Sequence, residues 1–189
     1  MQTWLPQIGY ADSMRMLDTN RLRKQRNDCW HILQMLESLP SNPQAAGNRH
    51  ALVFMWKGHE RSLCLLGIMA CYELRIGRRE GCDLYPKLHK LDNDLKAAGL
   101  TASPPPWLHD LDVHRAYRSN LIRVNDGYAP LWPGTPERMP YLFPQVVDTD
   151  PRGYRLRLLN ADIQRLESGE RKLPDWLWWD NNKRQVLGF

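Results

Sequence analysis

The fold is decided by the stretch Asn20-Arg21-Leu22-Arg23-Lys24-Gln25-Arg26-Asn27-Asp28, which opens a helix that continues to Leu36. At about 100° per residue, one side of this helix forms an apolar stripe. The stripe consists of Leu22, Cys29, Leu33 and Leu36. Its flank carries a cation, an amide and an acid, followed by an apolar residue: Arg21, Gln25, Asp28 and Ile32. The spacing therefore predicts that Asp28 lies at the edge of the core.

Asp28 has two interpretations at this stage. A partly buried ionised carboxylate is costly unless it is paired, so Asp28 either forms an ion pair with Arg21 or another cation, or has a chemical task. The helical geometry taken alone favours the ion pair.

Most of the remaining chain is also predicted to be helical. A short helix is expected over residues 12–17, and Asp18 or Thr19 is expected to cap the long helix. Four further helices are expected. The first ends at Trp56, and the second starts at Lys57 or Gly58 and forms the apolar central core. The third spans residues 87–98 and the fourth residues 111–124. Gly99 is expected to end the third of these, and the prolines at 104–106 to separate two elements.

The last third of the chain reads as a covering layer and a tail. Residues 127–144 are rich in Pro, Trp and Tyr and predict an extended coat over the helices. A short helix is expected over residues 160–167, and the alternation over residues 154–158 fits a single strand without an evident partner. We therefore predict an all-α fold: a compact single-domain helical bundle over residues 1–144, with a C-terminal extension over 145–189 packed on it.

Composition favours a basic protein with a polyanionic partner. The 189 residues include 26 Lys and Arg against 21 Asp and Glu, which gives a net charge of +5 and a pI near 9.1. No basic segment followed by an apolar one begins the chain, and the longest apolar run, residues 63–72, is about half a membrane span. We expect a soluble cytoplasmic protein without a membrane partner.

Cysteine and histidine spacing does not predict a metal centre. The four cysteines lack CxxC spacing, and no pair of the six histidines has a usual zinc spacing. We expect buried, reduced thiols, no structural metal and no cofactor.

Two further features have open interpretations. The apolar N-terminal residues Trp4, Leu5, Pro6 and Ile8 are expected to pack on the body, either to hold the α-amino group in place or merely as a hydrophobic tether. On the helix over residues 111–124, His114, Arg115 and Arg118 can share one face. Guanidinium groups suit phosphate, but a solvated face or ion pairs to Asp110 and Asp112 explain the pattern equally well.

Three blocks of sequence together resemble a known enzyme family. The first is Leu17-Asp18 with Arg21-Leu22-x-Lys24-Gln25-Arg26-x-Asp28; the second is His50 with Met55-Trp56-Lys57-Gly58-His59-Glu60; the third is His114-Arg115-x-x-Arg118-Ser119-Asn120-Leu121-Ile122-Arg123, followed by Tyr128 and Pro140-Tyr141-x-x-Pro144. In order and spacing they resemble the pyrimidine-dimer DNA glycosylases, typified by phage endonuclease V, over roughly residues 1–144. The tail from Gln145 has no counterpart.

The resemblance implies a DNA glycosylase with AP-lyase activity. In that family the N-terminal α-amine attacks the sugar C1′ of a damaged nucleotide, expels the base and forms a Schiff base that leads to β-elimination. Here the amine would be that of Met1, and the family's acidic residue falls on Asp28. The implied partner is damaged or modified duplex DNA, bound by a monomer in a bacterial or phage-infected cell. The DNA-contacting residues would be Arg21, Lys24, Gln25, Arg26, His50, Trp56, His114, Arg115 and Arg118.

This chemistry has a physical basis. An α-amine has an ordinary pKa of about 7.7 to 8.0, against about 10.4 for lysine, so part of it is nucleophilic near neutral pH. A neighbouring carboxylate stabilises positive charge at the sugar and transfers a proton.

The chain departs from the family in three respects. Gln2 is too large for usual removal of the first methionine, Asp28 is one methylene shorter than the family's glutamate, and Asn27 replaces an arginine.

Two other functions fit the sequence. The first is a non-catalytic nucleic-acid-binding module on the same scaffold. The second is a structural protein that binds a partner through its Trp-rich tail.

Overall fold

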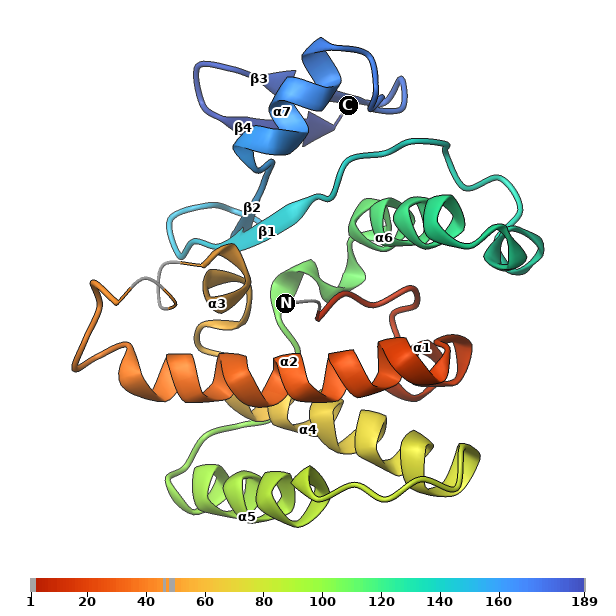
Figure 1. The fold of residues 1–189 in the computed structure, drawn as a ribbon. Coiled ribbons are helices and arrows are strands. Elements are labelled where there is room, and N and C mark those ends of the chain that lie inside the picture. The colour runs from red at the N-terminus through yellow and green to blue at the C-terminus, as the bar shows by residue number, and fades with distance from the viewer. Residues whose placement is uncertain (1–2, 46, 48–49, 189) are drawn as a thin grey trace. The chain divides into compact units, whose positions relative to one another are not determined.

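The computed structural model describes residues 3–45, 47 and 50–188 (Figure 1). About 54% of it is helical. The chain folds into two compact units, residues 1–105 and residues 106–189. Their junction lies in the run of prolines at 104–106, and the predicted boundary after residue 144 falls inside the second unit.

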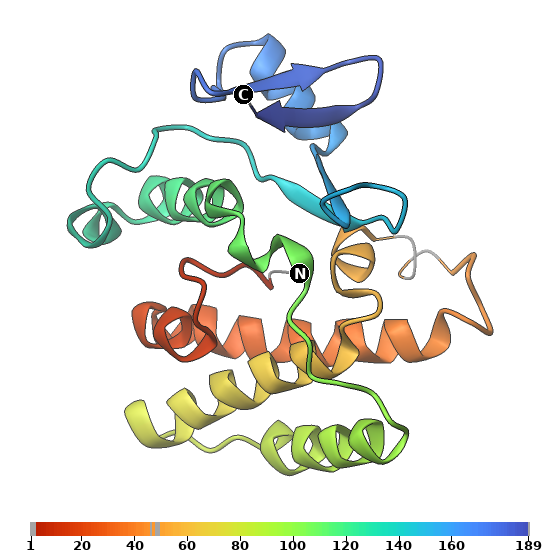
Figure 2. The same cartoon turned by 180° about the vertical axis from the view of Figure 1, so that it is seen from behind.

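The first unit is built from helices. Its elements are α1 (Tyr10–Met16), α2 (Thr19–Ser38), α3 (Ala51–Trp56), α4 (Glu60–Tyr72), a π-helical turn η2 (Glu73–Gly77) and α5 (Leu84–Ala97). Both views show α4 between α2 and α5 (Figures 1 and 2), and α4 packs against both. The helices predicted over this part of the chain are confirmed, with bounds that differ by a few residues.

Local sequence explains how α2 and α4 form and meet. Asp18 caps α2, because its Oδ1 accepts the backbone N–H of Arg21 at 2.9 Å. On α4, a Cβ at Gly67 would lie 3.1 Å from Leu88 Cδ1 and 3.2 Å from Cys29 Cβ. The missing side chain of Gly67 therefore allows α2 and α5 to approach α4 closely, and α4 is the central core helix, as predicted.

The second unit combines helices with a small sheet. Its helical elements are η3 (Pro106–His109), α6 (Leu111–Val124), η4 (Asp126–Leu131) and α7 (Asn160–Glu167). Its strands are β1 (Phe143–Val146), β2 (Tyr154–Arg157), β3 (Leu177–Asp180) and β4 (Gln185–Gly188), and they form an antiparallel sheet in the order β1-β2-β4-β3.

The all-α prediction is wrong for the second unit. The strand suspected at residues 154–158 is real, and it has partners: Leu156 pairs with Pro144 of β1 and with Val186 of β4. Pro144 cannot donate a backbone hydrogen bond, which hides β1 in the sequence. It is tolerated because β1 is an edge strand.

Two contacts tie the second unit together around α6. Asp110 caps α6 by accepting the N–H of Asp112 at 3.0 Å, and its other oxygen accepts the hydroxyl of Tyr154 at 2.6 Å. Burial, and then the hydrogen bond to Asp110 and the negative charge of that residue, raise the pKa of Tyr154. The first turn of α6 therefore holds β2.

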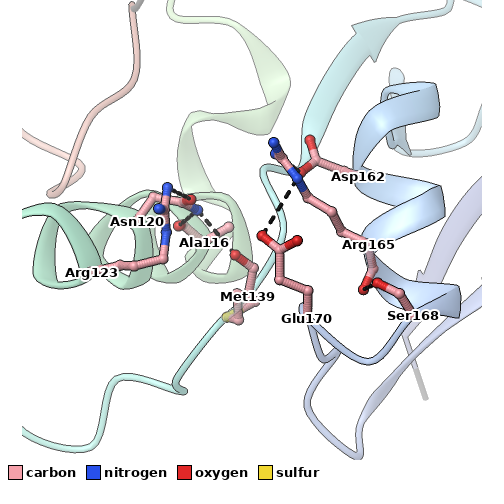
Figure 3. Close-up of polar contacts among 8 residues, drawn as sticks. All are labelled: Ala116, Asn120, Arg123, Met139, Asp162, Arg165, Ser168 and Glu170. Atoms are coloured by element: carbon pink, nitrogen blue, oxygen red, sulfur yellow. Dashed lines mark hydrogen bonds and ion pairs between the residues drawn. The ribbon is translucent and has the colours of Figure 1, made fainter.

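The coat segment is fixed on the other end of α6. The buried Asn120 amide donates to the carbonyls of Ala116 at 2.8 Å and Met139 at 3.0 Å (Figure 3). The Met139 N–H donates to Ser119 Oγ at 2.9 Å. Figure 3 also shows Arg165 of α7, whose Nη1 lies 3.5 Å from Asp162 Oδ1 and whose Nε lies 3.6 Å from Glu170 Oε1. The extended segment predicted between residues 127 and 144 therefore covers α6 closely at Met139.

The four cysteines are free thiols. Cys29, Cys64 and Cys71 are buried, as expected, whereas Cys82 is partly exposed, because it lies in the loop before α5. Burial raises the pKa of Cys64 to about 12, so this thiol is not a nucleophile at neutral pH. Within the described ranges, no helix has the length and apolar character to cross a bilayer.

Candidate active site

Asp28 lies on α2 with its side chain turned into the first unit. The residue is only 5% exposed, and its neighbours along the same flank, Gln25 and Ile32, are buried as well. The position predicted from helical spacing is therefore correct. An acid at such depth needs compensation, because burial disfavours its charged form.

A lysine lies beside this carboxylate. Lys24 Nζ is 3.4 Å from Asp28 Oδ2, one turn earlier on the same helix, and its side chain is 48% exposed. Arg21, the other cation considered, forms an ion pair with the capping Asp18. The ion-pair interpretation of Asp28 thus has a partner in Lys24, whose side chain is half exposed.

The N-terminal segment is anchored to Gln25, one helical turn before Asp28. Thr3, Trp4 and Leu5 are buried. The amide of Gln25 donates to the carbonyl of Trp4 at 3.3 Å, and the indole N–H of Trp56 donates to Thr3 Oγ1 at 2.9 Å. The segment is thereby attached to both α2 and α3, as its apolar sequence predicts. Met1, the proposed nucleophile, lies outside the described residues.

His50 belongs to the same electrostatic environment. Its Nδ1 accepts the backbone N–H of Leu52 at 3.2 Å and so caps α3. Burial lowers the pKa of His50, and the negative charge of Asp28 acts in the opposite direction. Because Nδ1 accepts a hydrogen bond, the neutral ring carries its proton on Nε2.

Gln25 and Trp56 are internal residues in this structure. Both were implied as DNA contacts, but each side chain is buried and donates to the N-terminal segment. Arg26 lies about 200° around α2 from Asp28. Its side chain contacts the loop before α5, with Nη1 at 3.7 Å from Cys82 Sγ and 4.0 Å from Asp83 Oδ1.

The remaining candidates lie on α6 in the second unit. His114 is fully buried, with Nε2 at 2.8 Å from the carbonyl oxygen of Leu108. Arg115 pairs with Asp112 at 3.0 Å, which is one of the alternatives that the sequence left open. Arg118 lies over the ring of Trp132 at 5.9 Å, and burial, followed by the charge of Arg115, lowers its pKa. Arg115 and Arg118 thus share a partly exposed strip of α6, whereas His114 faces the core.

Sequence reasoning missed two features of the molecule. Thr3 is the acceptor for Trp56, 53 positions away, and no local pattern indicates such a distant pair. The second feature is a polar cavity beside Trp176 in the second unit. The sequence shows a Trp-rich tail, but no local pattern indicates that Arg138 and Lys172 line a cavity with Trp176.

Comparison with known proteins supports one class, the DNA glycosylases. Residues 1–79 match the model of a family described as pyrimidine dimer DNA glycosylase. This confirms the resemblance for the blocks around Asp28 and His50; the block on α6 lies outside the match. No curated protein and no solved structure shows significant similarity to the chain. The matched family implies DNA as substrate and glycosylase activity on pyrimidine dimers.

Proposed function

We propose that this protein is a DNA glycosylase that removes damaged pyrimidines, with AP-lyase activity through its terminal amine. One observation carries the proposal. Asp28 is buried on α2 within the matched residues, one turn from the point where Gln25 anchors the N-terminal segment. The reaction needs a carboxylate close to an amine nucleophile.

The proposed steps divide the work between two groups. The neutral α-amine of Met1 forms a bond to C1′ while the bond from C1′ to the base breaks and the base leaves with a proton. The attacking nitrogen supplies the proton that the base carries away, and opening of the sugar ring, with O4′ protonated from solvent, then gives a protonated Schiff base. Loss of a C2′ proton expels the 3′ phosphate and cuts the strand. The Asp28 carboxylate stabilises the positive charge at C1′ and accepts a proton.

Because Thr3 is anchored, the α-amine of Met1 can lie only a short distance from the bond between Thr3 and Trp56. Two residues span at most about 7 Å, even when they are fully extended. Thr3 is held by Trp56 and Trp4 by Gln25. The attachment therefore supports a role in positioning the start of the chain, beyond that of a hydrophobic tether.

Borohydride trapping tests the covalent step. The protein is incubated with duplex DNA that carries either a pyrimidine dimer or an abasic site, and the Schiff base is reduced. Intact-mass measurement first establishes that Met1 is present with a free amine. We expect a covalent adduct with both duplexes, located on Met1 by peptide mass spectrometry. An adduct on a lysine would reassign the nucleophile, and absence of any adduct would reject the lyase activity.

Asp28→Asn tests the acid. Single-turnover base release should fall by about 10²- to 10⁴-fold, while the affinity for DNA changes little. Glu37→Gln is the matched control, because Glu37 lies on the same helix with an exposed side chain. Parallel loss of base release, affinity and stability in Asp28→Asn would give Asp28 a structural role only.

The ion pair between Lys24 and Asp28 favours one alternative, a nucleic-acid-binding module without chemistry. In that case binding to DNA would weaken with rising salt concentration, and the wild-type protein would release no base from any damaged duplex.

A further inference from the structure

A cavity of about 450 Å³ lies within the second unit, between residues 134–138 of the coat and residues 172–176 of the tail. Its volume is within the range of small-molecule sites, about 300 to 1,000 Å³. The N–H of Lys172 donates to the carbonyl of Arg138 at 3.1 Å and joins the two walls. The coat wall is fixed again at Met139, which accepts a hydrogen bond from Asn120 of α6 (Figure 3) and donates one to Ser119. The cavity therefore has anchored walls on both sides.

Trp176 lines this cavity as an exposed but oriented ring. The residue is 42% exposed, and its indole N–H donates to Asp112 Oδ1 at 3.0 Å. The same oxygen accepts Arg115 Nη1 at 3.0 Å, and the Arg115 guanidinium lies 5.5 Å from the centre of the Trp176 ring. Asp112 thus orients both the ring and the cation. A ring fixed before binding loses little conformational freedom when a ligand stacks on it.

The charges around the cavity nearly cancel. Arg138 and Lys172 line it together with Glu137 and Asp175. A groove for a run of phosphates would be strongly positive, so this balance favours a neutral planar group accompanied by a single phosphate. An aromatic side chain next to a cation is the combination on which unpaired bases stack.

Arg138 has a strained backbone. Its φ is +56°, in the left-handed region that favours glycine. Strain of this kind persists where the surroundings enforce it and is frequent at functional sites. The cavity is thus lined by an arginine at a position where glycine would be less strained.

We propose that Trp176 and this cavity bind one unstacked nucleobase of DNA, with its flanking phosphate held by Lys172 and Arg138. The proposal rests on the proposed function in one respect, namely that DNA is the substrate. It gives the tail a role in DNA binding, in a region outside the residues that match the glycosylase family.

Binding to a labelled single-stranded oligodeoxythymidylate tests the stacking. In fluorescence anisotropy titrations, Trp176→Ala should weaken binding by about 5- to 150-fold, and Trp176→Phe should retain most of the affinity. Trp178→Ala is the matched control, because Trp178 is 39% exposed on the adjacent strand β3 and does not line the cavity. We expect this control to bind within about twofold of wild type. Equal affinity of all three variants, or equal losses at Trp176 and Trp178, would overturn the proposal.

Salt dependence tests the phosphate contact. Lys172→Ala should reduce the slope of log K against log salt by about 0.7, the value for one phosphate of a single strand. Trp176→Ala should lower the affinity without changing the slope. Arg138→Gly relieves the backbone strain, so its Tm should equal or exceed that of wild type while its affinity falls. If the slope and the affinity were unchanged in both Lys172→Ala and Arg138→Gly, the proposed phosphate contact would be rejected.

The two proposals fail separately. The oligonucleotide is undamaged and the assay requires no cleavage, so a protein without glycosylase activity would still show Trp176-dependent binding. Base release by the wild-type protein with no effect of Trp176→Ala on binding would instead reject the stacking site alone.

Discussion

The side-chain amide of Gln25 donates to the main-chain carbonyl of Trp4 at 3.3 Å, inside the first unit. The bond joins the helix that carries Asp28 to the segment that precedes α1. If that segment positions the terminal amine, its effect on chemistry should be separable from its effect on DNA binding.

Gln25→Met should release this segment. The volume is kept but the donor is lost, which costs about 1 kcal/mol of stability. We expect the rate of borohydride trapping to fall at least about 10-fold, since misplacement by about 1 Å can cost 10²-fold, with DNA affinity unchanged. Gln34→Met, at an exposed position of α2, is the control. A matching loss of affinity would mean that Gln25 contacts DNA itself.

Lys24→Met distinguishes the two interpretations of Asp28. The Lys24 side chain is half exposed, so its ion pair is worth at most about 1 kcal/mol. We expect the free energy of urea unfolding to change by less than about 1 kcal/mol and single-turnover base release to stay within about 10-fold, far from the loss in Asp28→Asn.

Lys90→Met is the control for this prediction, because Lys90 and Asp94 form the same i,i+4 pair on α5, at 2.7 Å. If Lys24→Met and Asp28→Asn reduced base release equally, the pair would act as one unit and Asp28 would have no separate role.

Helical periodicity predicted the parts of this molecule that depend on local sequence. The burial of Asp28, the capping by Asp18 and the extents of α6 and α7 follow from spacing and from capping residues within one or two turns. The sheet could not be predicted in this way. Its strands have four residues each, too few to establish alternation, and Leu156 pairs with Val186, thirty positions away.

The candidate site shows the same division. Asp28 was identified from one helix and from the resemblance, whereas its surroundings depend on distant pairs such as Thr3 with Trp56. His114 shows the limit of the argument from a helix face. The spacing could place it with Arg115 and Arg118, but the carbonyl of Leu108 offers it a partner in the core.

Asp150→Asn should reveal a pH-dependent turn between β1 and β2. Asp150 accepts the N–H of Arg152 at 3.0 Å and lies 3.4 Å from the Arg155 guanidinium. The bond from the Arg152 backbone, aided by both arginines, lowers the pKa of Asp150. A lowered carboxyl pKa contributes stability above the unfolded value of about 3.9, and this is lost as the pH falls through the folded pKa.

We therefore expect Asp150→Asn to unfold about 0.5–1.5 kcal/mol more easily than wild type at pH 7, with the difference shrinking below about pH 4. Urea unfolding across this range measures it. Asp148→Asn, at an exposed position of the same turn, is the control. A difference that stays constant down to the acid transition would show that Asp150 has an ordinary pKa.

His50→Asn should remove a second pH dependence, in the first unit. The neutral His50 ring caps α3 through Nδ1, and burial lowers its pKa below the ordinary value of about 6.5. The unfolded chain therefore binds a proton at higher pH than the native protein, so stability is lost as the pH falls below about 6.5. Asparagine caps helices well at any pH.

Urea unfolding should give wild type and His50→Asn similar free energies of unfolding at pH 7.5. Towards pH 5.5, His50→Asn should become increasingly more stable than wild type. His31→Asn, exposed on α2, controls for loss of a histidine, and a constant difference between wild type and His50→Asn would show that protonation of His50 is not coupled to folding.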